Sequence, residues 1–220
     1  MTRKHFGNME PTSSTSHLGY ERPEPYPIFN WRNGVVPGTE LTYLRRTIDV
    51  DEALKQARGP FGFDLEWKPT FVKGYPESPI AVLQLANEDQ ICLIQLSAMH
   101  EFPEKLREVL EDPSIVKAGV GIANDARKLW RDCGVSLLGA VELSHLARSV
   151  DTLRWRTGKQ GELISLSRLM EAYQSRRLPK GKIRISNWEL PLTPQQMNYA
   201  ASDGLAGFVI YQHLKNLNPQ

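Results

Sequence analysis

Asp64 and Glu66 are the first residues whose types and spacing indicate chemistry. They lie in segment 61–67, an aromatic-rich run flanked by prolines, which predicts a β-strand. Because side chains alternate along a strand, both carboxylates point to one face and three apolar side chains to the other. Two such acids repel each other unless a cation lies between them, and Mg²⁺ and Mn²⁺ prefer oxygen ligands of this kind. The alternative is a solvated edge strand with two surface acids.

A third acid, Asp203, lies inside a predicted helix over residues 193–217. Thr193 and Gln196 form a capping-box pair at its start. Tyr199 lies four residues before Asp203, so the phenol and the carboxylate share one face of the helix. The surroundings of Asp203 are small and apolar, which favours a metal-ligand role over the alternative of a solvated surface acid.

A fourth acid, Asp125, lies in the first turn of a helix predicted over residues 122–133, directly after the turn Gly119-Val120-Gly121. An aspartate near a helix N-terminus is also favoured by the helix dipole, so a purely structural role is the alternative. A dinucleotide-binding glycine loop is rejected, because Asn124 stands where that pattern needs Gly or Ala and no acid follows at the usual distance.

The remaining pattern supplies the elements that must position these acids. Strands are predicted at residues 41–44, 61–67, 80–85, 91–96, 115–118 and 140–143. Helices are predicted at residues 50–58 (with Asp49 as N-cap), 103–111, 122–133, 144–149, 163–173 and 193–217. Three neighbouring strands with short connections indicate an antiparallel meander, and the later alternation of strand and helix indicates an α/β domain with a mixed sheet.

Residues 1–38 show no hydrophobic period and are rich in Pro, Ser, Thr, Gly and Asn, so we expect a flexible or loosely packed lead-in before one domain over residues 39–218. Four apolar side chains are candidates to dock part of this lead-in onto the domain: Tyr26, Ile28, Phe29 and Trp31.

The 220-residue chain is 40% hydrophobic and 24% charged, the composition of a globular domain. No apolar run reaches the roughly 20 residues of a membrane span, so no membrane contact is expected. The two cysteines, Cys92 and Cys133, favour a reducing compartment over a disulfide scaffold. We expect an intracellular protein, in the nucleus first, with the cytoplasm or a mitochondrion as alternatives.

The acid-bearing segments resemble those of a known enzyme family. Strand FDLEW, a middle aspartate after a glycine turn and YAASD in the last helix are similar to the DEDD superfamily of 3′–5′ exonucleases. The runs VKAGVGI, VEL and ISNW extend the resemblance over roughly residues 41–217. Tyr199, four residues before Asp203, is typical of the DEDDy subgroup; the DEDDh subgroup would have His where Asn198 stands.

This resemblance implies an RNase H-like α/β fold, a mixed sheet of five to six strands with helices on both faces. It also implies 3′–5′ hydrolysis of DNA, with RNA as an alternative, by two divalent ions, Mg²⁺ or Mn²⁺, releasing 5′-mononucleotides. By resemblance, Asp64 bridges both ions, Glu66 and Asp203 bind one of them, and Asp125 holds the other. Tyr199 then contacts the attacking water or the scissile phosphate.

A nucleic-acid partner fits the charge distribution. Residues 148–184 contain ten Lys and Arg against three acids, which indicates a basic surface beside the acidic centre, or else solvated helix faces. Candidates for binding the strand backbone are Arg176, Arg177, Lys180, Lys182 and Arg184. Trp67 is a candidate for base stacking, although its strand face favours the core. Trp188 is expected to be a packing residue. No partner protein is evident.

Two further functions stay open at this stage. One is an RNA-processing exoribonuclease, since the same acids serve either polymer. The other is a non-catalytic nucleic-acid-binding module on the same fold, which a missing acid would have favoured; all four acids are present.

Overall fold

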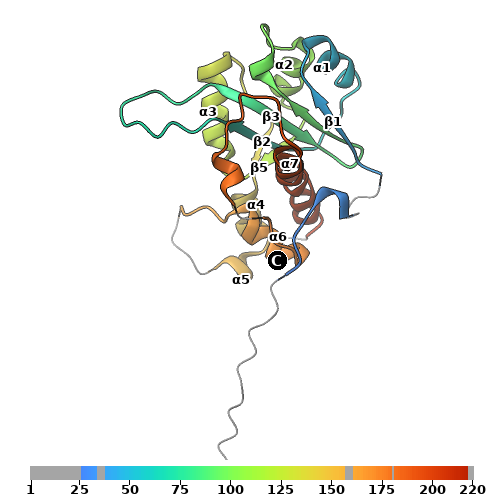
Figure 1. The fold of residues 1–220 in the computed structure, drawn as a ribbon. Helices are drawn as coiled ribbons and strands as arrows, with labels where there is room; N and C mark the ends of the chain where they lie inside the picture. Colours follow the sequence, from blue (N-terminus) through green and yellow to red (C-terminus); the bar gives the residue numbers. More distant parts are fainter. Residues whose placement is uncertain (1–25, 34–37, 157–160, 180, 218–220) are drawn as a thin grey trace, which may run out of the picture.

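A six-stranded mixed sheet forms the centre of the computed structural model, which describes residues 26–33, 38–156, 161–179 and 181–217 (Figure 1). The strands are β1 (Glu40–Leu44), β2 (Phe61–Trp67), β3 (Ile80–Ala86), β4 (Gln90–Ile94), β5 (Lys117–Gly119) and β6 (Ala140–Glu142), in the order β1-β4-β3-β2-β5-β6. The predicted meander is confirmed, because β2 pairs antiparallel with β3 and β3 with β4. The other three pairings are parallel.

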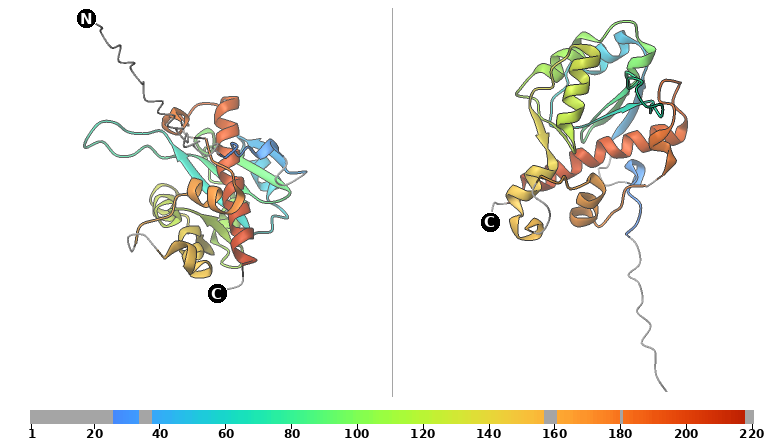
Figure 2. Two further views of the ribbon diagram at one scale, coloured as in Figure 1. Left: turned by 90° about the horizontal axis from the view of Figure 1, so that it is seen from below. Right: turned by 90° about the vertical axis from the view of Figure 1, so that its left-hand side faces the viewer.

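Helices cover both faces of this sheet, as predicted. They are α1 (Thr47–Ala53), α2 (Glu104–Glu111), α3 (Ile122–Cys133), α4 (Leu143–Val150), the unpredicted α5 (Thr152–Trp155), α6 (Leu166–Gln174) and α7 (Pro194–Lys215). Figure 2 shows α3 and α7 on either side of the sheet. Short 3₁₀ turns are η1 (Trp31–Asn33), η2 (Leu96–Ala98) and η3 (Lys182–Ile185). Within the described ranges, no helix combines the length and the apolar character needed to cross a membrane.

The two faces of the sheet carry separate hydrophobic cores. Phe63 and Leu65 of β2 belong to the core under α1, α2 and α3. Val82 and Ala86 of β3 belong to the core under α4, α6 and α7. Because strand side chains alternate, Gly62 and both acids of β2 face the α7 side of the sheet.

The first helix differs from its prediction. We predicted a helix over residues 50–58 capped by Asp49, but α1 spans Thr47–Ala53 and Arg46 stands at its N-cap. The Asp49 carboxylate accepts a hydrogen bond from Nε of Arg46 at 2.6 Å, inside the first turn. An acid in the first turn of a helix is favoured by the dipole just as a cap is, so the prediction assigned the right stabilising residue to the wrong place.

Part of the predicted lead-in, residues 26–33, packs against the domain. Phe29 is fully buried, and its backbone N–H donates to the carbonyl of Arg177 at 2.8 Å. The backbone N–H of Arg177 in turn donates to the carbonyl of Pro27 at 3.1 Å. Residues 1–25 and 34–37 lie outside the described residues, as does residue 218, so the division of the chain into lead-in and domain stays a prediction.

Candidate active site

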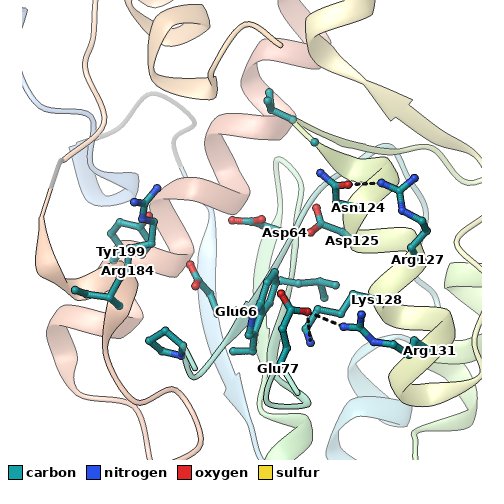
Figure 3. Close-up of a pocket in the computed structure, with 16 residues that line it drawn as sticks. Asp64, Glu66, Glu77, Asn124, Asp125, Arg127, Lys128, Arg131, Arg184 and Tyr199 are labelled. Atoms are coloured by element: carbon teal, nitrogen blue, oxygen red, sulfur yellow. Dashed lines mark hydrogen bonds and ion pairs between the residues drawn. The ribbon is translucent and has the colours of Figure 1, made fainter. Parts of the chain in front are cut away.

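Three of the predicted acids meet at one point of the sheet. Asp64 and Glu66 come from β2 and Asp203 from α7, and one carboxylate oxygen of each lies within 4.8 Å of the others. Glu66 is 7% exposed, while Asp64 and Asp203 are half-buried. The cluster lies at a cavity of about 760 Å³ that Asp64 and Glu66 line. Figure 3 shows the carboxylates of Asp64, Glu66 and Asp125 turned into this cavity.

Glycines allow α7 to bring Asp203 to the strand. A Cβ built on Gly62 of β2 would lie 2.5 Å from the backbone nitrogen of Phe208 and closer still to the carbonyl oxygen of Gly204. The backbones of strand and helix are therefore in direct contact, which only a residue without a side chain permits at Gly62. The start of α7 is fixed by the predicted capping box, in which the backbone N–H of Gln196 donates to Oγ1 of Thr193 at 3.2 Å.

The electrostatics of the cluster are unfavourable without a cation. Burial and the neighbouring Asp64 charge raise the pKa of Asp203 to about 7. Burial and the charges of Asp64 and Asp203 raise the pKa of Glu66 well above its usual range. Arg184 opposes both shifts but does not reverse them. The donor atoms of this cluster are all carboxylate oxygens, and the negative charges raise the pKa values of neighbouring acids. Such a set fits a hard divalent cation.

Asp125 lies beside this cluster and is 9% exposed. It does not cap α3, because the carboxylate of Glu142 accepts hydrogen bonds from the backbone N–H groups of Gly121 at 2.7 Å and Ile122 at 3.2 Å. Burial, Asp64 and Glu142 together raise the pKa of Asp125 to about 8. Glu142 already stabilises the first backbone N–H groups of α3, so a role of Asp125 in stabilising the helix start accounts poorly for its burial. Its carboxylate instead lines the cavity.

Tyr199 and Arg184 form the wall of the cavity opposite α3 (Figure 3). Burial, together with the negative charges of Asp203 and Glu66, raises the pKa of the Tyr199 phenol above its usual value. Tyr199 therefore stays protonated and acts as a hydrogen-bond donor. Trp188 is fully buried against the Tyr199 ring, with centroids 6.1 Å apart, so its predicted packing role is confirmed. Its Nε1 donates to the carbonyl of Arg184 at 3.3 Å.

Of the predicted backbone-binding cations, the structure brings Arg184 into the cavity, while Lys182 is exposed in the same turn, η3. Arg176 and Arg177 do not line this cavity, and Nε of Arg177 donates to the carbonyl of Tyr26 at 2.9 Å. Lys180 lies outside the described residues. Contact of these residues with nucleic acid stays a prediction.

Trp67 lies between the core and the cavity, while its stacking on a base stays a prediction. It is half-buried and packs beside the core of Phe63 and Leu65, yet it also lines the cavity. The register of β2 against β3 shifts between Glu66 and Trp67, and the extra residue, Ala81, lies on β3, so Trp67 keeps the side of the sheet that alternation predicts. The Lys128 ammonium lies 4.6 Å from the centroid of the Trp67 ring.

Sequence reasoning missed three cations on α3. Arg127, Lys128 and Arg131 line the cavity on the side facing Tyr199 (Figure 3). Helical spacing is the signal that was available: Lys128 lies three residues after Asp125, and Arg131 lies four after Arg127 and three after Lys128 in a helix that was itself predicted. Arg127 and Arg131 are exposed, so both are accessible to a phosphate backbone.

Comparison with known proteins identifies the family. A family model described as 3′–5′ exonuclease matches residues 41–218. The chain belongs to this 3′–5′ exonuclease family and is a nuclease hydrolase, as the resemblance implied.

Individual relatives agree with this assignment. The chain is 43% identical over 159 residues to the mouse bifunctional 3′–5′ exonuclease/ATP-dependent helicase WRN, a match that covers 71% of this chain and 11% of that protein. It is 30% identical over 224 residues to an Arabidopsis thaliana 3′–5′ exonuclease, covering 94% of this chain and 75% of that one. The chain thus spans about a tenth of the mouse protein's length.

The fold is shared with a solved structure, that of Escherichia coli RNase D, with a TM-score of 0.64 and 21% identity over 80% of this chain and 44% of the other. The RNase H-like class predicted from the sequence is thereby confirmed.

Proposed function

We propose that this exonuclease removes nucleotides from the 3′ ends of DNA with two Mg²⁺ or Mn²⁺ ions and releases 5′-mononucleotides. The observation that carries the proposal is the cluster of Asp64, Glu66 and Asp203 within 4.8 Å at a cavity walled by cations. Family members normally use divalent metals, and an all-carboxylate site suits ions that prefer oxygen.

In this proposal, Asp64, Glu66 and Asp203 would hold one ion, and Asp64 with Asp125 would hold the other. Together the ions would supply positive charge that stabilises the attacking and leaving oxygens of a phosphodiester. Water attacks phosphorus and the bond to the 3′-oxygen of the preceding nucleotide breaks, so the terminal nucleotide leaves with its 5′-phosphate. Arg184 pairs with the phosphate, and Tyr199, a protonated phenol, donates a hydrogen bond to the water or to a phosphate oxygen.

Replacing Tyr199 with phenylalanine tests this role. We expect turnover to fall about tenfold to a hundredfold, because one hydrogen bond to the reacting group is lost while the ring still packs against Trp188. Mn²⁺ should still raise the melting temperature of the variant, since every carboxylate remains. Unchanged turnover would assign Tyr199 a packing role instead.

The polymer and the polarity are tested together with 5′-labelled oligonucleotides on a denaturing gel. Single-stranded DNA, single-stranded RNA and a duplex with a recessed 3′ end are incubated with Mg²⁺, with Mn²⁺ and with EDTA. We expect a ladder that shortens from the 3′ end with metal and intact substrate in EDTA. Cleavage in EDTA would overturn the metal requirement. Intact substrate under every condition, with binding still visible by mobility shift, would instead favour the non-catalytic module.

RNA is the second candidate substrate. DNA follows from the sequence resemblance, whereas the fold is also that of E. coli RNase D, a protein described as an exoribonuclease involved in structured RNA processing. A tenfold or greater preference for the RNA oligonucleotide in the gel assay would select this candidate.

We also propose an intracellular, reducing location, with the nucleus first and the cytoplasm or a mitochondrion as alternatives. Cys92 and Cys133 are free thiols, and burial raises the pKa of Cys92 to about 11, so this thiol stays protonated and unreactive. Fluorescence microscopy of the tagged protein would distinguish the three compartments.

A further inference from the structure

The connection between β2 and β3, residues 68–79, projects from the body of the domain (Figures 1 and 2). Near its tip, three large apolar side chains are exposed: Phe71 (78%), Val72 (59%) and Tyr75 (71%). Single exposed apolar residues are ordinary, but three within five residues of one loop form a patch that favours contact with another molecule. We call residues 68–79 the aromatic loop.

The base of the aromatic loop is held firmly on α3. The Glu77 carboxylate pairs with Arg131 at 2.7 Å, and Nζ of Lys128 donates to the carbonyl of Ser78 at 2.8 Å. Asp132 accepts a hydrogen bond from the backbone N–H of Ile80 at 3.1 Å, where β3 begins. These three contacts fix where the loop leaves the sheet.

The loop is also bridged closer to its tip. The Thr70 hydroxyl donates to the carbonyl of Pro76 at 3.1 Å across the loop. The backbone N–H of Tyr75 donates to the carbonyl of Val72 at 3.2 Å, in a turn whose Gly74 has a φ of +88°. The two aromatic rings are thus presented by a closed loop, which lowers the entropy lost when they bind a ligand.

The aromatic loop borders the candidate active site. Trp67, Pro69 and Glu77, at its two ends, line the same cavity as Asp64 and Glu66. A strand whose 3′ end lies at the acids therefore has this loop at the rim of the cavity. Lys73, an exposed cation at the tip, adds attraction for phosphate.

We propose that Phe71 and Tyr75 form a stacking site for unpaired bases of the strand being degraded, 5′ of the nucleotide at the acids. The proposal rests on the proposed function, because it places the 3′ end at Asp64 and Glu66. Exposed aromatic rings next to a lysine suit single-stranded nucleic acid, since every base has a face that stacks and each stacked base contributes about 1–3 kcal/mol. Contact of the loop with a partner protein is the competing use and is an outcome of the test.

The test compares a long and a short substrate with the Phe71→Ala/Tyr75→Ala variant. The long substrate is a single-stranded DNA of twelve nucleotides, and the short one is the p-nitrophenyl ester of thymidine 5′-monophosphate, which occupies the acid site alone. We expect KM for the oligonucleotide to rise about tenfold or more, as the loss of one or two stacked bases implies. Its kcat, and kcat/KM for the ester, should stay within about twofold of wild type.

Two control variants keep the result specific. Ile48→Ala removes a similarly exposed apolar side chain from α1 and should leave KM and kcat for both substrates unchanged. Phe71→Trp/Tyr75→Trp keeps stacking surfaces and should restore a low KM for the oligonucleotide. An unchanged oligonucleotide KM in the double alanine variant would overturn the proposal and leave a partner protein as the use of the patch. An equal loss on both substrates would overturn it in favour of a structural role.

Binding of the same oligonucleotide is measured separately by fluorescence anisotropy in EDTA, where no turnover is expected. If the wild-type protein cleaved neither substrate, the proposed function would fail, while a weaker anisotropy signal for the double alanine variant would still support the stacking site. Equal binding by wild type and variant would refute the stacking site alone.

Discussion

Replacing Asp203 with asparagine is expected to abolish cleavage and, in metal-free protein, to raise the melting temperature. Turnover should fall on the order of a thousandfold, about 4 kcal/mol of transition-state stabilisation, because a proposed metal ligand is lost. The same carboxylate destabilises the fold when ionised, since burial and the charge of Asp64 raise its pKa to about 7. Asparagine keeps the size of the side chain without its charge.

The sign of the stability effect follows from this pKa. In the unfolded chain Asp203 ionises near its ordinary pKa of about 4. Ionising Asp203 therefore costs more free energy in the folded protein than in the unfolded chain. As pH rises from about 4 through 7, the folded state loses stability relative to the unfolded chain. The gain from Asp203→Asn should be largest at pH 8, on the order of 2 kcal/mol, and should fade toward pH 4.

Thermal melts in EDTA at pH 5 and pH 8, followed by melts with Mn²⁺, measure these effects. Mn²⁺ should raise the melting temperature of wild type and have little effect on the variant. Glu52→Gln, which removes an exposed acid of α1, serves as the matched control and should behave as wild type in all three conditions. Full activity of Asp203→Asn, or an equal Mn²⁺ response, would remove Asp203 from the metal site.

Replacing Gly62 with alanine should have the second large effect, on stability and metal binding together. The added methyl group would overlap the backbone of α7 at Gly204 and Phe208, and neither atom belongs to a flexible side chain. We expect the free energy of unfolding to fall by about 3 kcal/mol, the upper part of the range for overpacked cores. Because α7 must move away from β2, Asp203 separates from Asp64, and the affinity for Mn²⁺ should fall as well.

Gly204→Ala is the matched control for this substitution. Its methyl group would meet only the Cβ of Gln84 at 3.2 Å and that of Ala86 at 3.6 Å, and alanine stabilises a helix interior relative to glycine by about 1 kcal/mol. Urea unfolding followed by circular dichroism should show this variant close to wild type. If Gly62→Ala matched it in stability and in Mn²⁺ titration, the close contact between β2 and α7 would not limit the site.

Elements with strong local signals were predicted well. The bounds of β2 and α3 agree with the prediction. Prolines flank the strand and glycines flank the helix, and these residues mark where each element begins and ends. The meeting of Asp64, Glu66 and Asp203 was also expected, although from family resemblance, since alternation in a strand and spacing in a helix do not say which helix lies on which face.

Features that depend on contacts distant in sequence were not predicted. The cations of α3 were missed because they line the cavity only if α3 turns that face toward β2. The burial of Phe29 depends on a backbone pairing with Arg177 that no local pattern reveals. Asp49 shows the opposite difficulty, since a cap and a first-turn acid look alike until the partner, Arg46, is placed.

The packing of α7 against the middle of the sheet has a consequence for biosynthesis. The ribosome releases β2, with Asp64 and Glu66, long before it releases α7, with Asp203. Until then the face of β2 and β3 that carries Val82 and Ala86 has no cover from α7, and the acid cluster lacks Asp203. We therefore expect a nascent chain to lack the complete acid cluster, and to be most exposed to aggregation or chaperone capture, until α7 is made.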